Sequence, residues 1–482
     1  MPLLNPSQRA PAALAIAAAL ALAGCATPNA HPSVDVPAQF TSAPAAAEEA
    51  AVAWWDSFHD PALSDLVRRA ARENRDIRMA AQRLRAARAG ETISRSALFP
   101  SVDLSASGVH RDTRHPDAVK QLVPDAKTGN AGLGVSWELD LSGRLRAGAS
   151  AARADALAAE DGVRGVRLLV VSDVATNYFT LVGAQRQLET MRAISAAQDE
   201  TLRLVSARQR AGLATPFDVE RAQTEAGTAR AAIPPLESAA AIARHRIAVL
   251  IGDQASRAGA IVPWTGEAAV PPTHAGQPAT LLQRRPDLLA LNAQLDAANA
   301  RRQQAAAEWF PRLFLGAMFG REGLELNGVD LGAARFTNVT GLLAMPIFNA
   351  GRTRALNDAA QSAQDEAALR YEDGIVRALE DVENALVVLH DEREREASMR
   401  QAASSADSAL QRAESLYHRG QIDLLPLLDA QRTRLNVRLA ANDSHTQLLL
   451  DSVRLYKALG GGWEAFEPAP PAAAASAPSS QS

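Results

Sequence analysis

Histidine and aspartate residues with the chemistry to bind a metal ion gather between positions 110 and 117. His110 and His115 lie beside Asp112 and Asp117 within a run of mixed charge. Their spacing matches no zinc motif such as HExxH, and a solvated, charged loop tip explains such a run better than a metal site does. The sequence also lacks a Walker A loop, a GxGxxG motif and a GxSxG nucleophile motif. We therefore expect no catalytic residues, no metal and no cofactor.

A single cysteine occupies a position where covalent chemistry is expected. An apolar stretch from Ala10 to Gly24 ends at Leu22-Ala23-Gly24-Cys25. Fifteen helical residues reach only about 22 Å, too short to cross a membrane, so the stretch is typical of an export signal. Its end resembles the bacterial lipoprotein processing site, which implies acyl chains on Cys25 and, with Ala26 following, delivery to the outer membrane. An ordinary signal peptide with an incidental cysteine is the alternative.

The composition excludes several classes of protein. The 482 residues include 50 Lys and Arg against 54 Asp and Glu, so the strong basic excess of a nucleic-acid surface is missing. One cysteine allows neither an intrachain disulfide nor a Cys-based metal site. Aromatic residues make up only 4% of an alanine-rich chain, which favours long helices packed closely side by side.

The chain repeats itself once. Phe99-Pro100 recurs as Phe310-Pro311, and a separation of 208 positions relates Gly143-Arg144 to Gly351-Arg352 and Gly212 to Gly420. Such stable offsets indicate two structurally equivalent halves.

Each half begins with alternating apolar and polar residues. In the first half Val102, Leu104 and Ala106 alternate with serines and Asp103, and a second alternating run covers positions 131 to 142. This period of two predicts a β-hairpin over 99–142 with one apolar and one polar face. The second half repeats the pattern over 310–348, although Phe314 and Met318 interrupt the alternation.

A long helical hairpin follows each strand pair. The runs 144–210 and 351–425 contain no proline, and apolar residues recur in the second at steps of four and three, as in a coiled-coil seam. Glycine-containing turns then reverse the chain, which forces the helices to be antiparallel neighbours. The expected organisation is a signal peptide (1–24), a lipid-anchored tether (25–53), a first repeat (54–253, with helical hairpin 144–251), a linker or equatorial segment (254–280), a second repeat (281–467, with helical hairpin 351–459) and a disordered tail (468–482).

Four strands per chain cannot close a barrel, because the smallest spanning barrels have eight. Open strand edges are not tolerated in a bilayer, where each unpaired backbone group costs several kcal/mol. We therefore expect the chain to assemble with copies of itself. Three copies supply twelve strands and twelve long helices. A twelve-stranded barrel is larger than the filled eight-stranded ones, so we expect it to be hollow.

The sequence resembles the TolC-type outer membrane factors, and among them the NodT-like outer membrane efflux lipoproteins. The resemblance covers nearly all of 54–464. It is carried by Trp55, Phe58, Asp60, Leu63, Leu66, Asn74, Asp76, Leu282, Arg284-Arg285-Pro286-Asp287-Leu288, Phe310-Pro311-Arg312-Leu313, Pro346-Ile347-Phe348-Asn349-Ala350-Gly351-Arg352, Tyr417-His418-Arg419-Gly420 and Leu428-Asp429-Ala430-Gln431. It implies a homotrimer with a twelve-stranded outer membrane β-barrel, a periplasmic α-barrel and an equatorial belt. It also implies a periplasmic adaptor and an inner membrane pump of the RND type as partners.

The resemblance further implies a gate at the periplasmic helix tips, made of polar links between the two helical hairpins. The motifs place the gate candidates at Asp218, Tyr417 and Asp429. Ile422 stands where some members have an arginine, and Pro426 where some have a second acidic residue. Purely structural roles are the alternative: Asp218 as a helix cap and Tyr417 as seam packing.

The favoured function is therefore a passive exit duct for small molecules and drugs in the outer membrane, extending into the periplasm. A structural coiled-coil lipoprotein that acts as a spacer is one alternative, but a spacer needs no bilayer-spanning strands. A duct for secreted polypeptides would share the fold and stays open.

Overall fold

The computed structural model describes residues 29–30, 34–42, 51–120, 122–266 and 268–467. The expected signal peptide, Cys25 and the expected tail lie outside these residues. The chain divides into two compact units. Unit 1 comprises the described parts of Met1–Ser33, Arg83–Glu160 and Ala290–Glu372, and unit 2 those of Val34–Gln82, Asp161–Leu289 and Asp373–Ser482.

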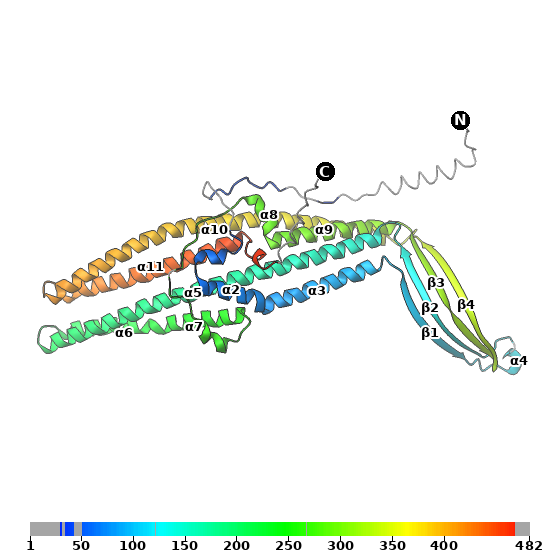
Figure 1. Cartoon of the computed structure of the whole chain (residues 1–482), viewed down its shortest axis with the longest axis horizontal. Coiled ribbons are helices and arrows are strands. Elements are labelled where there is room, and N and C mark those ends of the chain that lie inside the picture. The colour runs from blue at the N-terminus through cyan, green and yellow to red at the C-terminus, as the bar shows by residue number, and fades with distance from the viewer. Residues whose placement is uncertain (1–28, 31–33, 43–50, 121, 267, 468–482) are drawn as a thin grey trace, which may run out of the picture. The chain divides into compact units, whose positions relative to one another are not determined.

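Unit 1 contains one antiparallel sheet with the strand order β1-β2-β3-β4 (Figure 1). Its strands are β1 (Ser101–Arg111), β2 (Ala126–Leu139), β3 (Arg312–Leu326) and β4 (Val329–Ala344). Each half of the chain supplies one hairpin, and β2 pairs with β3 to join the halves. The predicted hairpins are confirmed, but His110 and Arg111 belong to β1 and Lys127 to β2, so the first loop is shorter than its charges suggested.

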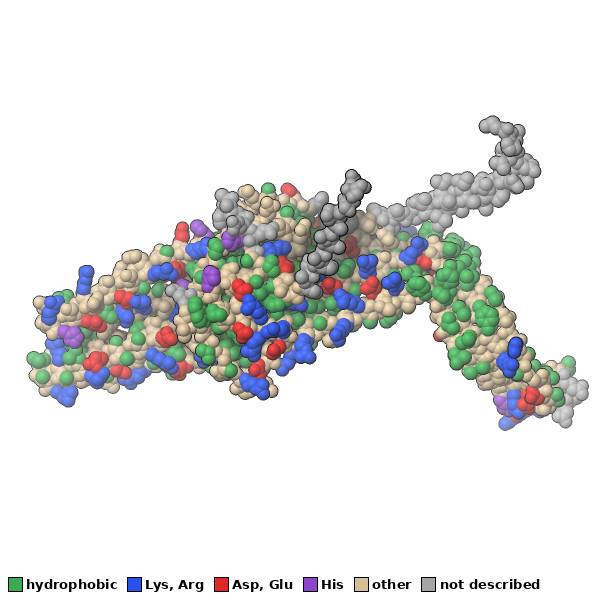
Figure 2. All heavy atoms as spheres, viewed as in Figure 1, with side chains coloured by type: hydrophobic (Ala, Val, Ile, Leu, Met, Phe, Trp, Pro, Cys, Tyr) green, Lys and Arg blue, Asp and Glu red, His purple; other side chains and the backbone are tan. Residues whose placement is uncertain are grey.

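The register assigns every strand residue to one of two faces. Val102, Val135, Ala317 and Val339 are paired in one row, and Leu104, Leu133 and Phe319 lie in the next. We call this the apolar face. Figure 2 shows hydrophobic side chains gathered over these strands, with charged side chains toward the α4 end (Asp117–Lys120).

The opposite face, which we call the polar face, carries Ser101, Asp103, Ser136 and Asn130 on the first hairpin. Phe314, Met318 and Phe336 share this face on the second hairpin, which explains why they interrupt the alternation in the sequence. A Cβ on Gly320 would lie only 2.9 Å from the Phe336 ring, so the aromatic ring covers the glycine on the neighbouring strand.

Two very long helices confirm the other main expectation. α5 (Arg144–Arg210) and α10 (Arg352–His418) each contain 67 residues. The seam residues Val171, Val174, Val382 and Leu386 are buried, as the heptad spacing predicts. By length and composition α5 is the one described helix that could cross a membrane, but half of its most apolar window is buried within the protein.

The returning helices differ between the halves. In the second half α11 (Leu424–Ala458) is continuous, whereas in the first half the chain forms α6 (Pro216–Ala231) and α7 (Ile233–Leu250) with a break at Ala232. Pro234 and Pro235 follow this break, because proline removes a backbone donor and is tolerated in the first turn of a new helix. The remaining elements are η1 (Trp54–Phe58), α2 (Pro61–Glu73), α3 (Arg75–Ser96), η2 (Ala255–Ala260), η3 (Pro278–Thr280), α8 (Leu281–Arg284), α9 (Pro286–Ala306), η4 (Ala307–Trp309) and η5 (Glu464–Phe466).

An aromatic core within unit 2 joins η1 to α11 and to η5. Trp54 stacks on Tyr456 with ring centroids 5.2 Å apart, and Trp55 stacks on Phe466 at 5.3 Å. Burial raises the pKa of Tyr456 to about 12. The first stack holds η1 against α11, and the second joins η1 to η5.

Candidate functional site

The three predicted gate residues all lie near the helical turns of unit 2. Asp218 is in the first turn of α6, Tyr417 is in the last turn of α10, and Asp429 is in the second turn of α11. Cys25, the predicted lipidation site, lies outside the described residues.

The two turns have the same backbone geometry. Gly212 and Gly420 adopt φ values of +74° and +73°, which only glycine takes readily. The Gly212 N–H donates to the Gln209 carbonyl at 2.9 Å, and the Gly420 N–H donates to the Tyr417 carbonyl at 3.0 Å. The following residue in each turn donates to the carbonyl five positions earlier, as in a Schellman motif. The internal repeat is therefore preserved down to single hydrogen bonds.

Asp218 closes a capping box at the start of α6. Its carboxylate accepts hydrogen bonds from the Thr215 N–H at 2.9 Å and from the Thr215 hydroxyl at 2.8 Å. The Asp218 N–H donates in return to the Thr215 hydroxyl at 3.2 Å. These bonds to Thr215 lower the pKa of the Asp218 carboxyl, because they favour its charged form. The capping role that the sequence left open is thus observed.

The second half lacks this box. Asp423 stands at the N-cap of α11 in the position equivalent to Thr215, but its side chain makes no capping hydrogen bond. Pro426 stands at the position equivalent to Asp218. The two turns therefore share a backbone but differ in how firmly the returning helix is capped.

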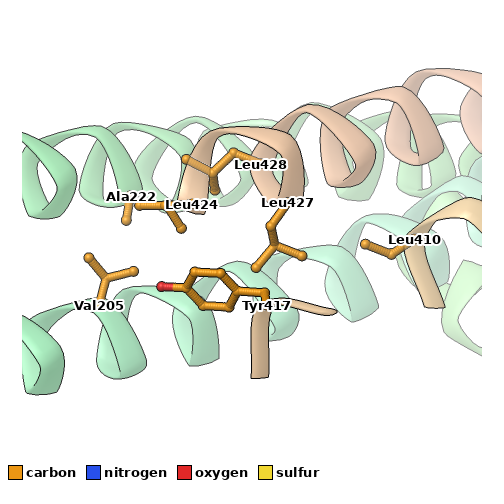
Figure 3. Packing of buried hydrophobic residues seen from close by; sticks show 7 residues of the cluster. All are labelled: Val205, Ala222, Leu410, Tyr417, Leu424, Leu427 and Leu428. Carbon is orange, nitrogen blue, oxygen red and sulfur yellow. The ribbon is translucent and has the colours of Figure 1, made fainter. Parts of the chain in front are cut away.

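Tyr417 is buried in a cluster that joins the two helical hairpins. Figure 3 shows its ring beside Leu427, with its hydroxyl directed toward Val205 of α5. The other members of the cluster are Ala222, Leu410, Leu424 and Leu428. Tyr417 is 4% exposed, so the packing role is also observed.

A cation–π contact connects the hairpins at the same place. The Arg208 guanidinium of α5 lies 4.9 Å from the centre of the Tyr417 ring. Within the described residues Asp218 and Tyr417 form no hydrogen bond with each other in this single chain. Sequence reasoning missed Arg208, because no local pattern marks an arginine whose partner lies 209 positions away.

Two polar contacts, one buried and one partly buried, extend the link along α5 and α11. The Gln431 amide donates to the Thr201 hydroxyl at 3.1 Å, and the Asn442 amide donates to the Thr190 hydroxyl at 2.9 Å. Asp429 takes no part in them; its side chain is 61% exposed and pairs with Arg432 of the next turn at 2.8 Å. Asp429 is thus accessible on the surface of α11 in the single chain.

The polar face of the sheet presents carboxylates without basic neighbours in the same rows. Asp103 pairs with Gly134 and Glu322 pairs with Asn130. Glu138, at the helical end of the sheet, is instead neutralised by Arg144 at 2.7 Å. A polar, mildly acidic face opposite an apolar face is what a membrane barrel needs for its lumen. No group of three or more potential metal ligands occurs in the described part of the chain.

Comparisons with known proteins agree with this architecture. The outer membrane efflux protein family model matches residues 66–253 and 278–461, one segment in each half. The chain is 32% identical over 457 residues to the outer membrane protein OprJ of Pseudomonas aeruginosa, covering 94% of this chain and 95% of OprJ. It is 29% identical over 465 residues to SilC of Salmonella typhimurium, described as a probable outer membrane lipoprotein, covering 93% of this chain and 98% of SilC.

The fold also matches a solved channel. The structure of the outer-membrane channel OprN superimposes with a TM-score of 0.83 at 30% identity, covering 91% of this chain and 99% of OprN. The predicted fold class, with four strands and two long helical hairpins per chain, is confirmed. The chain therefore belongs to the outer membrane efflux protein family.

Proposed function

We propose that three copies of the chain form a passive duct through which small molecules leave the cell. The observation that carries this proposal is the two-faced sheet with two open edges. Strands β1 and β4 are its edge strands, and neither has a second partner within the described chain. In a bilayer these backbone groups need partners, and β1 of the next copy pairing with β4 supplies them.

The energy for transport comes from elsewhere in this proposal. The sequence contains no nucleotide-binding motif that could power transport. In this proposal an inner membrane pump of the RND type drives the flow through a periplasmic adaptor. Exposed apolar side chains at the helical turns support adaptor docking there. Leu213, Phe217 and Leu425 are 69%, 67% and 54% exposed, so a partner that covers the turns would bury them.

The gate of the duct lies at the same turns. In the proposed closed state Arg208 and Tyr417 hold the two hairpins together, and the Thr201–Gln431 and Thr190–Asn442 bonds continue this link away from the turn. Opening then separates the hairpins from the tip inward, so that the Arg208–Tyr417 contact breaks first. Asp218 acts by keeping the first turn of α6 rigid, and Asp429 lines the constriction.

Lipid on Cys25 anchors the N-terminus in this proposal. The segment after Cys25 has fixed contacts: the Ala30 N–H donates to the Asn299 side-chain oxygen at 3.0 Å, and the Asn299 amide donates to the Ala30 carbonyl at 3.3 Å. The chain from Cys25 to Ala30 spans at most about 18 Å when extended. The two hydrogen bonds to Asn299 would therefore hold the acyl chains close to α9. Replacement of Cys25 by serine should abolish acyl-chain incorporation.

Conductance in planar lipid bilayers tests the proposal. A duct conducts ions weakly when its tips are shut and more strongly when Tyr417 is replaced by alanine. A spacer conducts nothing in either form. Loss of drug resistance without loss of any secreted protein in a deletion strain separates small-molecule efflux from polypeptide secretion.

A further inference from the structure

Two arginines face each other across neighbouring strands on the apolar face of the sheet. Arg321 of β3 and Arg335 of β4 are directly paired in the register. Both side chains are exposed. Like charges directly opposite each other in a sheet are destabilising, so such a pair calls for a counterion.

No carboxylate in the surrounding rows of this face supplies that counterion. The neighbouring positions on β2, β3 and β4 are Ala131, Phe319, Gly323, Ala333 and Thr337. Glu325 and its β4 partner Asp330 lie two rows away. Glu325 is bound to the Lys127 ammonium group at 3.0 Å, and Asp330 accepts a hydrogen bond from the Gly332 N–H at 2.8 Å. Among the described residues the pair thus has no acidic partner in its own row or in the adjacent rows of this face.

Closure of the barrel does not change this balance. The strand that would pair with β4 in the next copy is β1, whose residues on the apolar face are Val102, Leu104, Ala106, Gly108 and His110. None of them is acidic, whatever the register between the copies, because Asp103 belongs to the polar face. The anion must therefore come from outside the protein.

The position of the pair identifies the source of the anion. The row containing Phe319 is the last row of this face with large apolar side chains, and Arg321 and Arg335 occupy the next row toward α4 and the β3–β4 turn. This end of the sheet is opposite to the one from which the long helices leave, so it faces the outer leaflet. Arginine on the lipid face is costly at the membrane midplane but is tolerated near the interfaces.

We propose that Arg321 and Arg335 form a binding site for the phosphate group of an anionic lipid in the outer leaflet. Guanidinium groups bind phosphate through paired N–H donors, and two such groups facing one phosphate exchange like-charge repulsion for charge-assisted hydrogen bonds. The inference rests on the membrane orientation in the proposed function, but not on transport. One lipid is bound per chain.

The test is a titration of the full-length protein in neutral detergent with lipid A, with bound lipid measured by native mass spectrometry. We expect Arg335→Glu to weaken binding about tenfold or more, because each charge-assisted pair is strong and 1.4 kcal/mol corresponds to a factor of ten. The variant should still fold, since the new carboxylate pairs with Arg321 across the strands. Its unfolding temperature without lipid should match or exceed that of the wild type.

Arg111→Glu is the matched control, because Arg111 lies at the same end of the sheet but on the polar face. We expect this variant to bind lipid A like the wild type. Equal binding by the wild type and Arg335→Glu, or an equal loss in Arg111→Glu, would overturn the inference. Displacement of lipid A by an equal concentration of inorganic phosphate would overturn the assignment to a lipid. If the protein conducts normally but binds no lipid A, the lipid site is refuted while the proposed duct still stands.

Discussion

At the scale of single residues, the contact between Arg208 and Tyr417 joins two hairpins that have no short connection in the sequence. A cation over an aromatic ring contributes about 0.5 to 1 kcal/mol at an exposed site and more when it is desolvated. The Arg208–Tyr417 contact lies beside a buried apolar cluster, so breaking it also loosens side-chain packing. A weak, local link of this kind is suited to a gate that must open.

The first prediction concerns this link. Arg208→Gln should raise the open probability of the duct in planar bilayers by a few fold, because the closed state loses its cross-hairpin contact. Tyr417→Leu should do the same, and the double variant should add little, since both remove one interaction. The matched control is Arg203→Gln, because Arg203 is exposed and pairs with Glu200 of its own helix. Additive effects of the two gate substitutions would argue against a shared link.

The second prediction concerns the capping box of Asp218. Its folded-state pKa lies below the ordinary value, so its contribution to stability is complete at neutral pH and is lost as the pH falls through that lowered pKa. Asp218→Asn should reduce the hydrogen-exchange protection of the first turn of α6 about fivefold at neutral pH, as expected for a cap worth about 1 kcal/mol. As the pH falls through this lowered pKa, the variant and the wild type should converge. A difference that persists in acid would exclude the carboxylate as the cause.

At the scale of elements, the close approach of α5 to α11 depends on a glycine. A Cβ on Gly183 would lie 2.5 Å from the Thr446 side chain, whereas a Cβ on Gly162 of the same helix would meet nothing within 4 Å. The first glycine is therefore required by packing, while the second is a helix position with free space around it.

The third prediction compares these two glycines. Gly183→Val should destabilise the helical hairpins by about 1 to 3 kcal/mol, because the added atoms overpack the seam. Gly162→Ala should be neutral or stabilising, since alanine favours helix over glycine by about 1 kcal/mol. Denaturant unfolding followed by far-ultraviolet circular dichroism measures both. Equal effects of the two substitutions would contradict the packing described for this seam.

The fourth prediction separates the two faces of the sheet. Val339 lies on the apolar face and its neighbour Asn338 on the polar face. Val339→Arg should reduce the stability of the inserted barrel by about 2 to 4 kcal/mol, whereas Asn338→Arg should leave it nearly unchanged, because only the first places a charge against lipid. Unfolding from lipid vesicles by denaturant measures the difference. If the order of the two effects is reversed, the face assignment is wrong.

Much of this architecture is predictable from local signals. Proline-free runs predict α5 and α10, and the matching Gly212 and Gly420 predict the two turns that reverse the chain. The capping role of Asp218 follows from its spacing to Thr215, which is a capping-box pattern. In contrast, Arg208 contacts Tyr417, and Arg321 faces Arg335, through pairings that only the folded chain creates.

At the scale of the whole molecule, each chain supplies part of a channel wall rather than a closed channel. The sheet has edges at β1 and β4, and its polar face carries Asp103 and Glu322 toward a lumen that one chain cannot enclose. The duct, the gate and the orientation of the lipid-facing arginines all depend on closure of the wall by identical copies.

The mass of the protein extracted from its membrane in mild detergent, measured by light scattering with the detergent contribution subtracted, tests this claim most directly. We expect three times the mass of the processed chain, without a population of single chains. A monodisperse, folded monomer would contradict it, because four strands with unpaired edges have no stable place in a bilayer.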